Sequence, residues 1–168
     1  MPRIMNAMEQ ANLDPAVLKE RFRVRLDALL NEVRQWLSAD PRVLVTDHRY
    51  VVEDPFGRYE APGLQISAEG RIIAELVPEA GVVIAADGRV NLVGEIDRLT
   101  ILYLTGPGRF ESTINGVQHF GRNLFPQFSQ EGWYWLRNNE GPEVRFVDEA
   151  TFRLMIPAVS DFEVRVRS

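Results

Sequence analysis

Residues 64–77 read L-Q-I-S-A-E-G-R-I-I-A-E-L-V. Two β-rich runs, Leu64–Ala68 and Arg71–Val77, flank Glu69-Gly70. An acidic residue followed by glycine between two such runs predicts a two-residue hairpin turn, in which both turn residues adopt positive φ. The stretch therefore predicts two consecutive antiparallel strands.

Nearly the same phrase recurs as A-A-D-G-R-V at residues 85–90. It predicts a second hairpin of the same kind, with Asp87-Gly88 as the turn between Val82–Ala86 and Arg89–Val93. A phosphate-binding loop would need more glycines and a following helix, and neither is present. The repeated phrase is therefore interpreted as a β-meander and not as a binding site.

The chain continues this pattern on both sides, so residues 42–147 are predicted to form one antiparallel β region. Asn115-Gly116 is the strongest short hairpin signal in the chain. The run Leu99–Leu104 is apolar on both faces, which is typical of a central strand. The other predicted strands are Val43–Thr46, Arg49–Glu53, Arg58–Ala61, Phe110–Ile114, Val117–Phe120, Trp133–Arg137 and Glu143–Val147.

A long helix is predicted over residues 14–38, after a flexible arm at residues 1–13. Asp14 is a good N-cap, and Pro15 suits the first helical position. Apolar residues then recur at spacings of three and four and make one stripe: Leu18, Phe22, Leu26, Leu29, Leu30, Val33 and Leu37. Pro41 disfavours continuation of the helix beyond Asp40.

The C-terminal part, residues 148–168, is predicted to hold a short helix and a final strand. Asp148 can cap a helix through about Ile156, which Pro157 ends or kinks. Alternating residues then predict a strand over Phe162–Val166. The fold class is therefore α+β in a single domain, residues 1–168, with the long helix on a large, strongly bent antiparallel sheet or partial barrel.

The composition restricts the classes of function. The chain of 168 residues contains no cysteine, which excludes disulfides, thiolate metal sites and a cysteine nucleophile. The net charge of −5 argues against a nucleic-acid module that depends on its overall field. No apolar run is long enough to span a bilayer, and the first residues lack the apolar core of a signal peptide. These features predict a small soluble bacterial-type protein of the cytoplasm, with no membrane partner and no cofactor.

Trp133, Trp135 and Arg137 form the candidate binding surface. On a strand they share one face, with Tyr134 and Leu136 on the other. Tryptophan and arginine dominate the hot spots of protein interfaces, so this face could engage another protein. The alternative is that it packs against the long helix, with the polar atoms of its aromatic residues at the edge of the core.

No catalytic residue and no metal site is predicted. An alternative metal site could be assembled from His48, His119, Asp47 and Asp54, since imidazole and carboxylate suit zinc, manganese or iron. No recognised ligand spacing supports it, and the chain has no G-x-S-x-G nucleophile elbow.

The function predicted from these features is a non-enzymatic protein-binding module, such as an inhibitor or immunity-type protein or a subunit of an assembly. Its partner would be another protein or a second copy of itself. The alternative is a ligand-binding or metal-assisted enzyme with a pocket around His48 and His119, in which case the partner is a small ligand.

Overall fold

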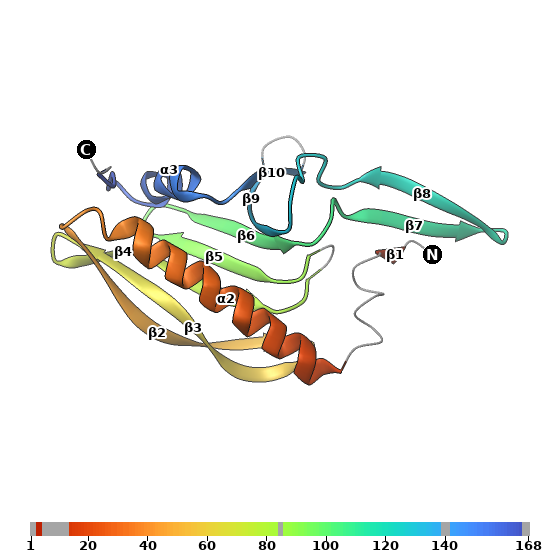
Figure 1. Ribbon diagram of the computed structural model, residues 1–168, viewed down its shortest axis with the longest axis horizontal. Helices are drawn as coiled ribbons and strands as arrows, with labels where there is room; N and C mark the ends of the chain where they lie inside the picture. Colours follow the sequence, from red (N-terminus) through yellow and green to blue (C-terminus); the bar gives the residue numbers. More distant parts are fainter. Residues whose placement is uncertain (1–2, 5–13, 84–85, 139–141, 166–168) are drawn as a thin grey trace.

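The structure is a computed structural model that describes residues 3–4, 14–83, 86–138 and 142–165. Side chains are described for these residues except 3–4, 109–113, 118–123, 138 and 142. The chain forms a long helix, an open seven-stranded antiparallel sheet, a small second sheet and a short helix (Figure 1). The α+β prediction is confirmed, and the sheet is not closed into a barrel.

The long helix, α2, spans Pro15–Leu37 and begins where the sequence predicts. The Asp14 side chain accepts a hydrogen bond from the Ala16 N–H at 2.9 Å, which caps the first turn. All seven residues of the predicted apolar stripe are buried, and all of them except Leu18 belong to the main core that the sheet and α3 complete. The helix therefore covers the inner face of its own sheet.

The strands of the large sheet follow in the spatial order β10-β9-β6-β5-β4-β3-β2. β2 and β10 are its two edges, and β6 is an interior strand, as the apolar run at Leu99–Leu104 predicts. The strands are β2 (Val43–Asp54), β3 (Gly57–Ala68), β4 (Arg71–Ala80), β5 (Arg89–Gly94), β6 (Arg98–Leu104), β9 (Gly132–Asn138) and β10 (Pro142–Phe146).

β2 and β3 are longer than predicted, because each combines two of the predicted strands into a continuous run of 12 residues. The hairpin coils, so that its inner face changes along its length. Val45 and Ile66 contact the core near one end, whereas Val52 and Tyr59 do so near the turn. The change occurs around Gly63, where a Cβ would lie 2.3 Å from the Leu76 carbonyl oxygen and 2.5 Å from the Tyr50 ring. Glycine is therefore required for this close approach.

Of the three hairpin turns predicted from a residue pair ending in glycine, those at Glu69-Gly70 and Asn115-Gly116 are confirmed. Glu69 and Gly70 have φ of 55° and 78°, and Asn115 and Gly116 have φ of 52° and 77°. The Asp87-Gly88 prediction is wrong. There the Asp87 N–H donates to the Tyr103 carbonyl and the Tyr103 N–H donates to the Gly88 carbonyl, so the pair extends the β5–β6 ladder.

The predicted strand Val82–Ala86 is also absent from the described residues of that segment, where only an isolated bridge joins Val83 to Ala86. Residues 84–85 lie outside the described part of the chain.

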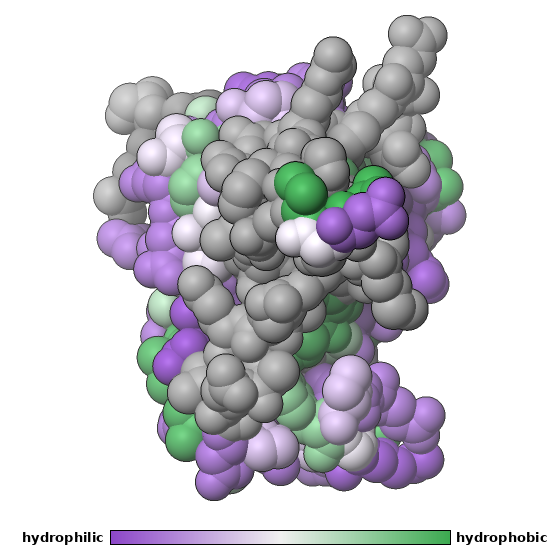
Figure 2. Space-filling view, turned by 90° about the vertical axis from the view of Figure 1, so that its right-hand side faces the viewer, coloured by the Kyte–Doolittle hydropathy of each residue, from purple (hydrophilic) through white to green (hydrophobic). Residues whose placement is uncertain are grey.

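The second sheet has the order β1-β7-β8 and projects from the large sheet in Figure 1. Its strands are β1 (Arg3–Ile4), β7 (Arg109–Ile114) and β8 (Val117–Asn123). β1 belongs to the predicted arm and pairs with β7, while the rest of the arm lies outside the described residues. Two exposed apolar side chains, Ile114 and Val117, flank the turn of the β7–β8 hairpin. Figure 2 views the molecule from the end at which this hairpin projects and shows apolar side chains there beside hydrophilic ones.

The short helix α3 spans Glu149–Val159 and continues through Pro157, three residues beyond the predicted end at Ile156. No strand follows it within the described residues, so the strand predicted from Phe162 is wrong as far as residue 165, and residue 166 lies outside them. The segment instead anchors to the start of β2. Buried Asp40 accepts hydrogen bonds from Arg42 Nη2 at 2.7 Å and from the Arg165 N–H at 2.9 Å.

Candidate functional site: the open edge of β2

β2 is the most exposed long element of the sheet. Only Val52 among its 12 residues is buried. Leu44 and Val51 are 62% and 53% exposed, although both are apolar. The strand has no proline, and its register with β3 is regular from Val43 to Asp54.

The hairpin turn determines which backbone groups of β2 face outward. Asp54 pairs with Gly57 across a two-residue loop, and such a turn is closed by a hydrogen bond between these residues. Hydrogen-bonded and non-hydrogen-bonded pairs alternate along an antiparallel ladder. The even-numbered residues from Leu44 to Asp54 therefore bond to β3, and the odd-numbered residues direct their N–H and C=O groups away from the sheet.

These outward groups are open to a new strand. The Val43 N–H donates to the Asp40 carbonyl at 3.1 Å. From Val45 to Glu53, no described residue outside the β2–β3 ladder hydrogen-bonds to the backbone of β2. Figure 1 shows the β2–β3 hairpin along one rim of the molecule. An edge of this length without cover is a template for strand addition.

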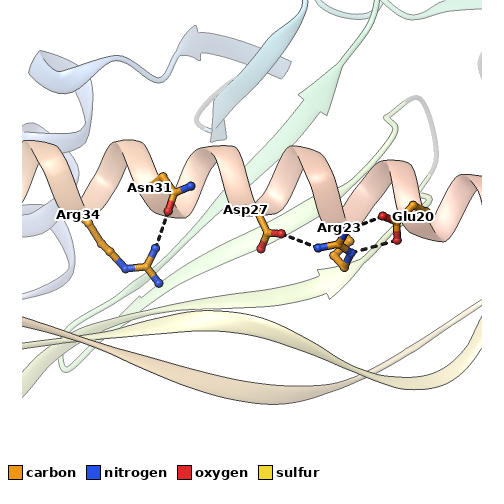
Figure 3. A network of polar contacts seen from close by, with 5 residues as sticks. All are labelled: Glu20, Arg23, Asp27, Asn31 and Arg34. Carbon is orange, nitrogen blue, oxygen red and sulfur yellow. Dashed lines mark hydrogen bonds and ion pairs between the residues drawn. The ribbon is translucent and has the colours of Figure 1, made fainter.

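The side of α2 that lies above this hairpin is polar. Arg23 donates hydrogen bonds to Glu20 and to Asp27, and Arg34 donates to Asn31, as Figure 3 shows. Arg34 also forms an ion pair with Asp47 of β2. Arg49 of β2 pairs with Glu60 of β3 at 3.4 Å. Charged side chains of alternating sign therefore border the open edge.

The three residues of the predicted aromatic surface lie on one face of β9, as the alternation predicts, but their exposure differs. Trp133 is 7% exposed, and its Nε1–H donates to the Arg25 carbonyl of α2 at 3.1 Å. It thus packs under the long helix and contacts solvent very little. Trp135 and Arg137 are half-buried, and the guanidinium of Arg137 lies 5.2 Å from the centre of the Trp135 ring.

Trp135 and Arg137 border a groove of about 360 Å³, which is lined by residues of the paired strands β6 and β9. Its other lining residues include Asp97, Arg98 and Thr100. The groove combines an aromatic ring with charges of both signs, so it can contact a polar segment of a partner. Arg137 forms only a long ion pair with Glu143 of β10, since its Nη1 lies 3.7 Å from the Glu143 Oε1.

The four residues of the alternative metal site do not come together. Asp47 and Asp54 lie seven residues apart on one strand, which separates them by about 23 Å. Asp54 already accepts hydrogen bonds from the Tyr59 hydroxyl and the Gly81 N–H. Exposed His48 packs edge-on against Tyr50, and His119 belongs to the second sheet, with a side chain outside the described set. Among the described residues, no three His, Asp or Glu side chains gather as metal ligands.

A larger hollow of about 470 Å³ lies between the first turns of α2 and the β2–β3 hairpin. Lys19, Arg23 and Arg49 line it together with Glu20, Asp27 and Glu60. Its charges are balanced and mostly paired with one another, so it favours no particular ligand charge.

Asp87 is a buried acid that the sequence analysis missed as a side chain of interest. It is 4% exposed, its Oδ2 accepts from the Thr105 hydroxyl at 2.7 Å, and its Oδ1 has no hydrogen-bond partner. Burial raises the pKa of this carboxyl, and the Thr105 hydrogen bond and the nearby Arg25 lower it in part. The Asp-Gly pattern gave no signal of burial, because the same pair is typical of exposed turns.

The open edge was also not identified from the sequence. One signal was available, because the first strand of a meander has a sequence neighbour on one side only.

Comparisons of the chain with protein-family models, with characterised proteins and with solved structures found no match. Neither helix of the described part is both long and apolar enough to cross a bilayer.

Proposed function

We propose that the protein is a non-enzymatic protein-binding module that takes an extended strand of its partner along the edge of β2. The observation that carries this proposal is the row of outward-facing N–H and C=O groups from Val45 to Glu53, which no described neighbour covers. Backbone hydrogen bonds supply affinity in strand addition, and side chains at alternate positions supply specificity. An inhibitor, an immunity-type protein or an assembly subunit could each use such an edge.

A proline at an outward-facing position tests this proposal. Val51→Pro removes an N–H that faces away from β3, so the ladder within the sheet stays complete. Val51→Ala shortens the same side chain but keeps the N–H, and is the matched control. Wild type and both variants are used to capture partners from a lysate of the source cells, and each captured protein is then produced and its dissociation constant measured.

The proposal requires that Val51→Pro loses the partner while Val51→Ala keeps it, with both variants showing a cooperative melt. If Val51→Pro binds the partner as tightly as Val51→Ala does, the edge of β2 is not the binding site.

The groove beside Trp135 and Arg137 is a second candidate surface for the same function. It is supported by the half-exposed Trp135 ring and by the charged side chains around it. Trp135→Ala is expected to weaken a partner complex without unfolding the protein. Loss of the cooperative melt in this variant would place Trp135 in the core and remove it from the binding surface.

A further inference from the structure

We propose that the partner strand is β2 of a second copy of this chain, paired antiparallel with the two His48 residues opposite each other. This inference rests on the proposed function, because it names the partner of the same edge. The outward-facing backbone groups of β2 and the opposite charges of Asp47 and Arg49 select this partner and this register.

The outward-facing groups restrict the register of such a pair. Only odd-numbered residues of β2 direct N–H and C=O groups outward, so hydrogen-bonded pairs across the new ladder must join odd to odd. With His48 opposite His48 of the second copy, Asp47 lies opposite Arg49 of the second copy. The two-fold symmetry of the dimer repeats this pair, so two complementary charge pairs form.

The neighbouring registers that keep the odd residues paired are less favourable. Sliding one strand by two residues in one direction places Asp47 opposite Asp47 of the second copy. Sliding it in the other direction places Arg49 opposite Arg49 of the second copy. Like charges directly opposite each other destabilise a strand pair, so the charges select the register centred on His48.

The apolar residues of β2 agree with the same register. Val51 lies opposite Val45 of the second copy, and this pair also occurs twice. Val51 is 53% exposed in the single chain, and a valine opposite it would cover part of that surface. Because the α2 side chains above the edge are polar, the association relies on the ladder and the charge pairs more than on apolar burial (Figure 3).

A charge exchange tests the partner and the register together. Asp47→Arg places arginines at both positions 47 and 49, and Arg49→Asp places aspartates at both. Each variant alone is expected to raise the dissociation constant of its homodimer by roughly tenfold or more, because two attractive pairs become repulsive. An equimolar mixture of the two variants is expected to dimerise, since every opposed pair is then complementary.

Sedimentation velocity at low ionic strength measures these masses, because exposed charge pairs are screened by salt. Glu53→Arg is the matched control: it changes the net charge by the same amount as Asp47→Arg, but residue 53 lies opposite Val43 of the second copy. It should dimerise like the wild type.

The outcomes separate this inference from the proposed function. A mixture that dimerises while each variant alone is a monomer supports β2 self-pairing in this register. A wild type that stays monomeric up to about 1 mM overturns self-pairing and leaves the edge to a different protein. If the dissociation constant of the dimer is unchanged in Asp47→Arg and Arg49→Asp but the dimer is lost in Val51→Pro, this register is wrong. If the dimer persists in Val51→Pro, self-pairing at this edge is wrong.

Discussion

The two edges of the seven-stranded sheet differ in how their backbone groups are protected. β10 has 5 residues and begins with Pro142, and the Val144 N–H donates to the Gln127 side chain at 3.3 Å. β2 has 12 residues, and none of the described residues outside the ladder bonds to its backbone beyond Val43. Shortness, proline and cover are the usual ways in which proteins block edges. β10 uses all three, whereas the described residues around β2 provide only charges, and charges of alternating sign can select a partner as well as exclude wrong ones.

The largest effect is expected at Gly63, where the β2–β3 hairpin changes its inner face. Gly63→Ala would place a Cβ against the Leu76 carbonyl and the Tyr50 ring. The neighbouring backbone must then shift, so the free energy of unfolding should fall by about 3 kcal/mol. Chemical denaturation measures the loss, with Gly106→Ala as the control, since a Cβ there meets nothing within 4 Å. Equal stability of the two variants would show that the coiled hairpin is not constrained at Gly63.

The next effect concerns Asp40, which ties the start of β2 to the C-terminal segment. The hydrogen bond from the Arg42 side chain holds the pKa of Asp40 well below its usual range, although burial opposes this. Asp40→Asn should lower the free energy of unfolding by about 2 kcal/mol at neutral pH, because buried donors lose their charged acceptor.

The pH dependence of this effect has a definite sign. Since the folded pKa of Asp40 is lowered, its contribution is complete above the unfolded pKa of about 3.9 and is lost as the pH falls toward the folded value. The difference between wild type and Asp40→Asn should therefore shrink in acid. A difference that is constant from pH 7 to pH 2 would contradict the ion pair.

A smaller effect is expected at the protected edge. Gln127→Ala removes the acceptor of the Val144 N–H and should cost about 1 kcal/mol of stability. It should leave the oligomeric state unchanged, because β10 remains short and begins with proline. If sedimentation showed new association through β10 in this variant, the hydrogen bond to Gln127 alone would be what prevents strand pairing at β10.

The smallest effect is expected at Asp87, a buried acid that lies just before β5 and pairs through its backbone with Tyr103 of β6. Burial raises the pKa of this acid, so its ionisation in the folded state lowers stability as the pH rises from the unfolded pKa through the folded pKa. Asp87→Asn should change stability at pH 7 by less than about 1 kcal/mol. The wild type should gain stability relative to the variant as the pH falls toward 4. The opposite trend would mean that Asp87 is stabilised as a carboxylate.

Much of the fold is predictable from local sequence. Asp14, Pro15 and the apolar stripe define α2, and Asn115-Gly116 and Glu69-Gly70 define two turns, because each signal acts over a few residues. The sequence around Asp87-Gly88 is nearly the same as that around Glu69-Gly70, but it forms no turn. Its backbone pairs instead with Tyr103, which follows Asp87 by 16 residues. Long-range pairing of this kind overrides local turn propensity.

The candidate site was less predictable. Alternation places Trp133, Trp135 and Arg137 on one face, but whether α2 covers that face depends on how the helix crosses the sheet. Likewise, the gap expected between Thr46 and Arg49 does not occur, because Asp47 and His48 pair with Leu64 and Gly63 of β3. The exposed edge follows from the strand order, which short-range patterns do not determine.

Residue-resolved amide hydrogen exchange along β2, measured at low and high protein concentration, tests whether the outward-facing backbone groups of this strand pair with a second copy. The N–H groups of Leu44, Thr46, Tyr50 and Val52 face β3 and should exchange slowly at both concentrations. Those of Val45, Asp47, Arg49 and Val51 face outward and should exchange rapidly at low concentration and slowly at high concentration, in step with dimer formation. Outward amides that stay equally fast while the protein dimerises would contradict strand pairing at this edge.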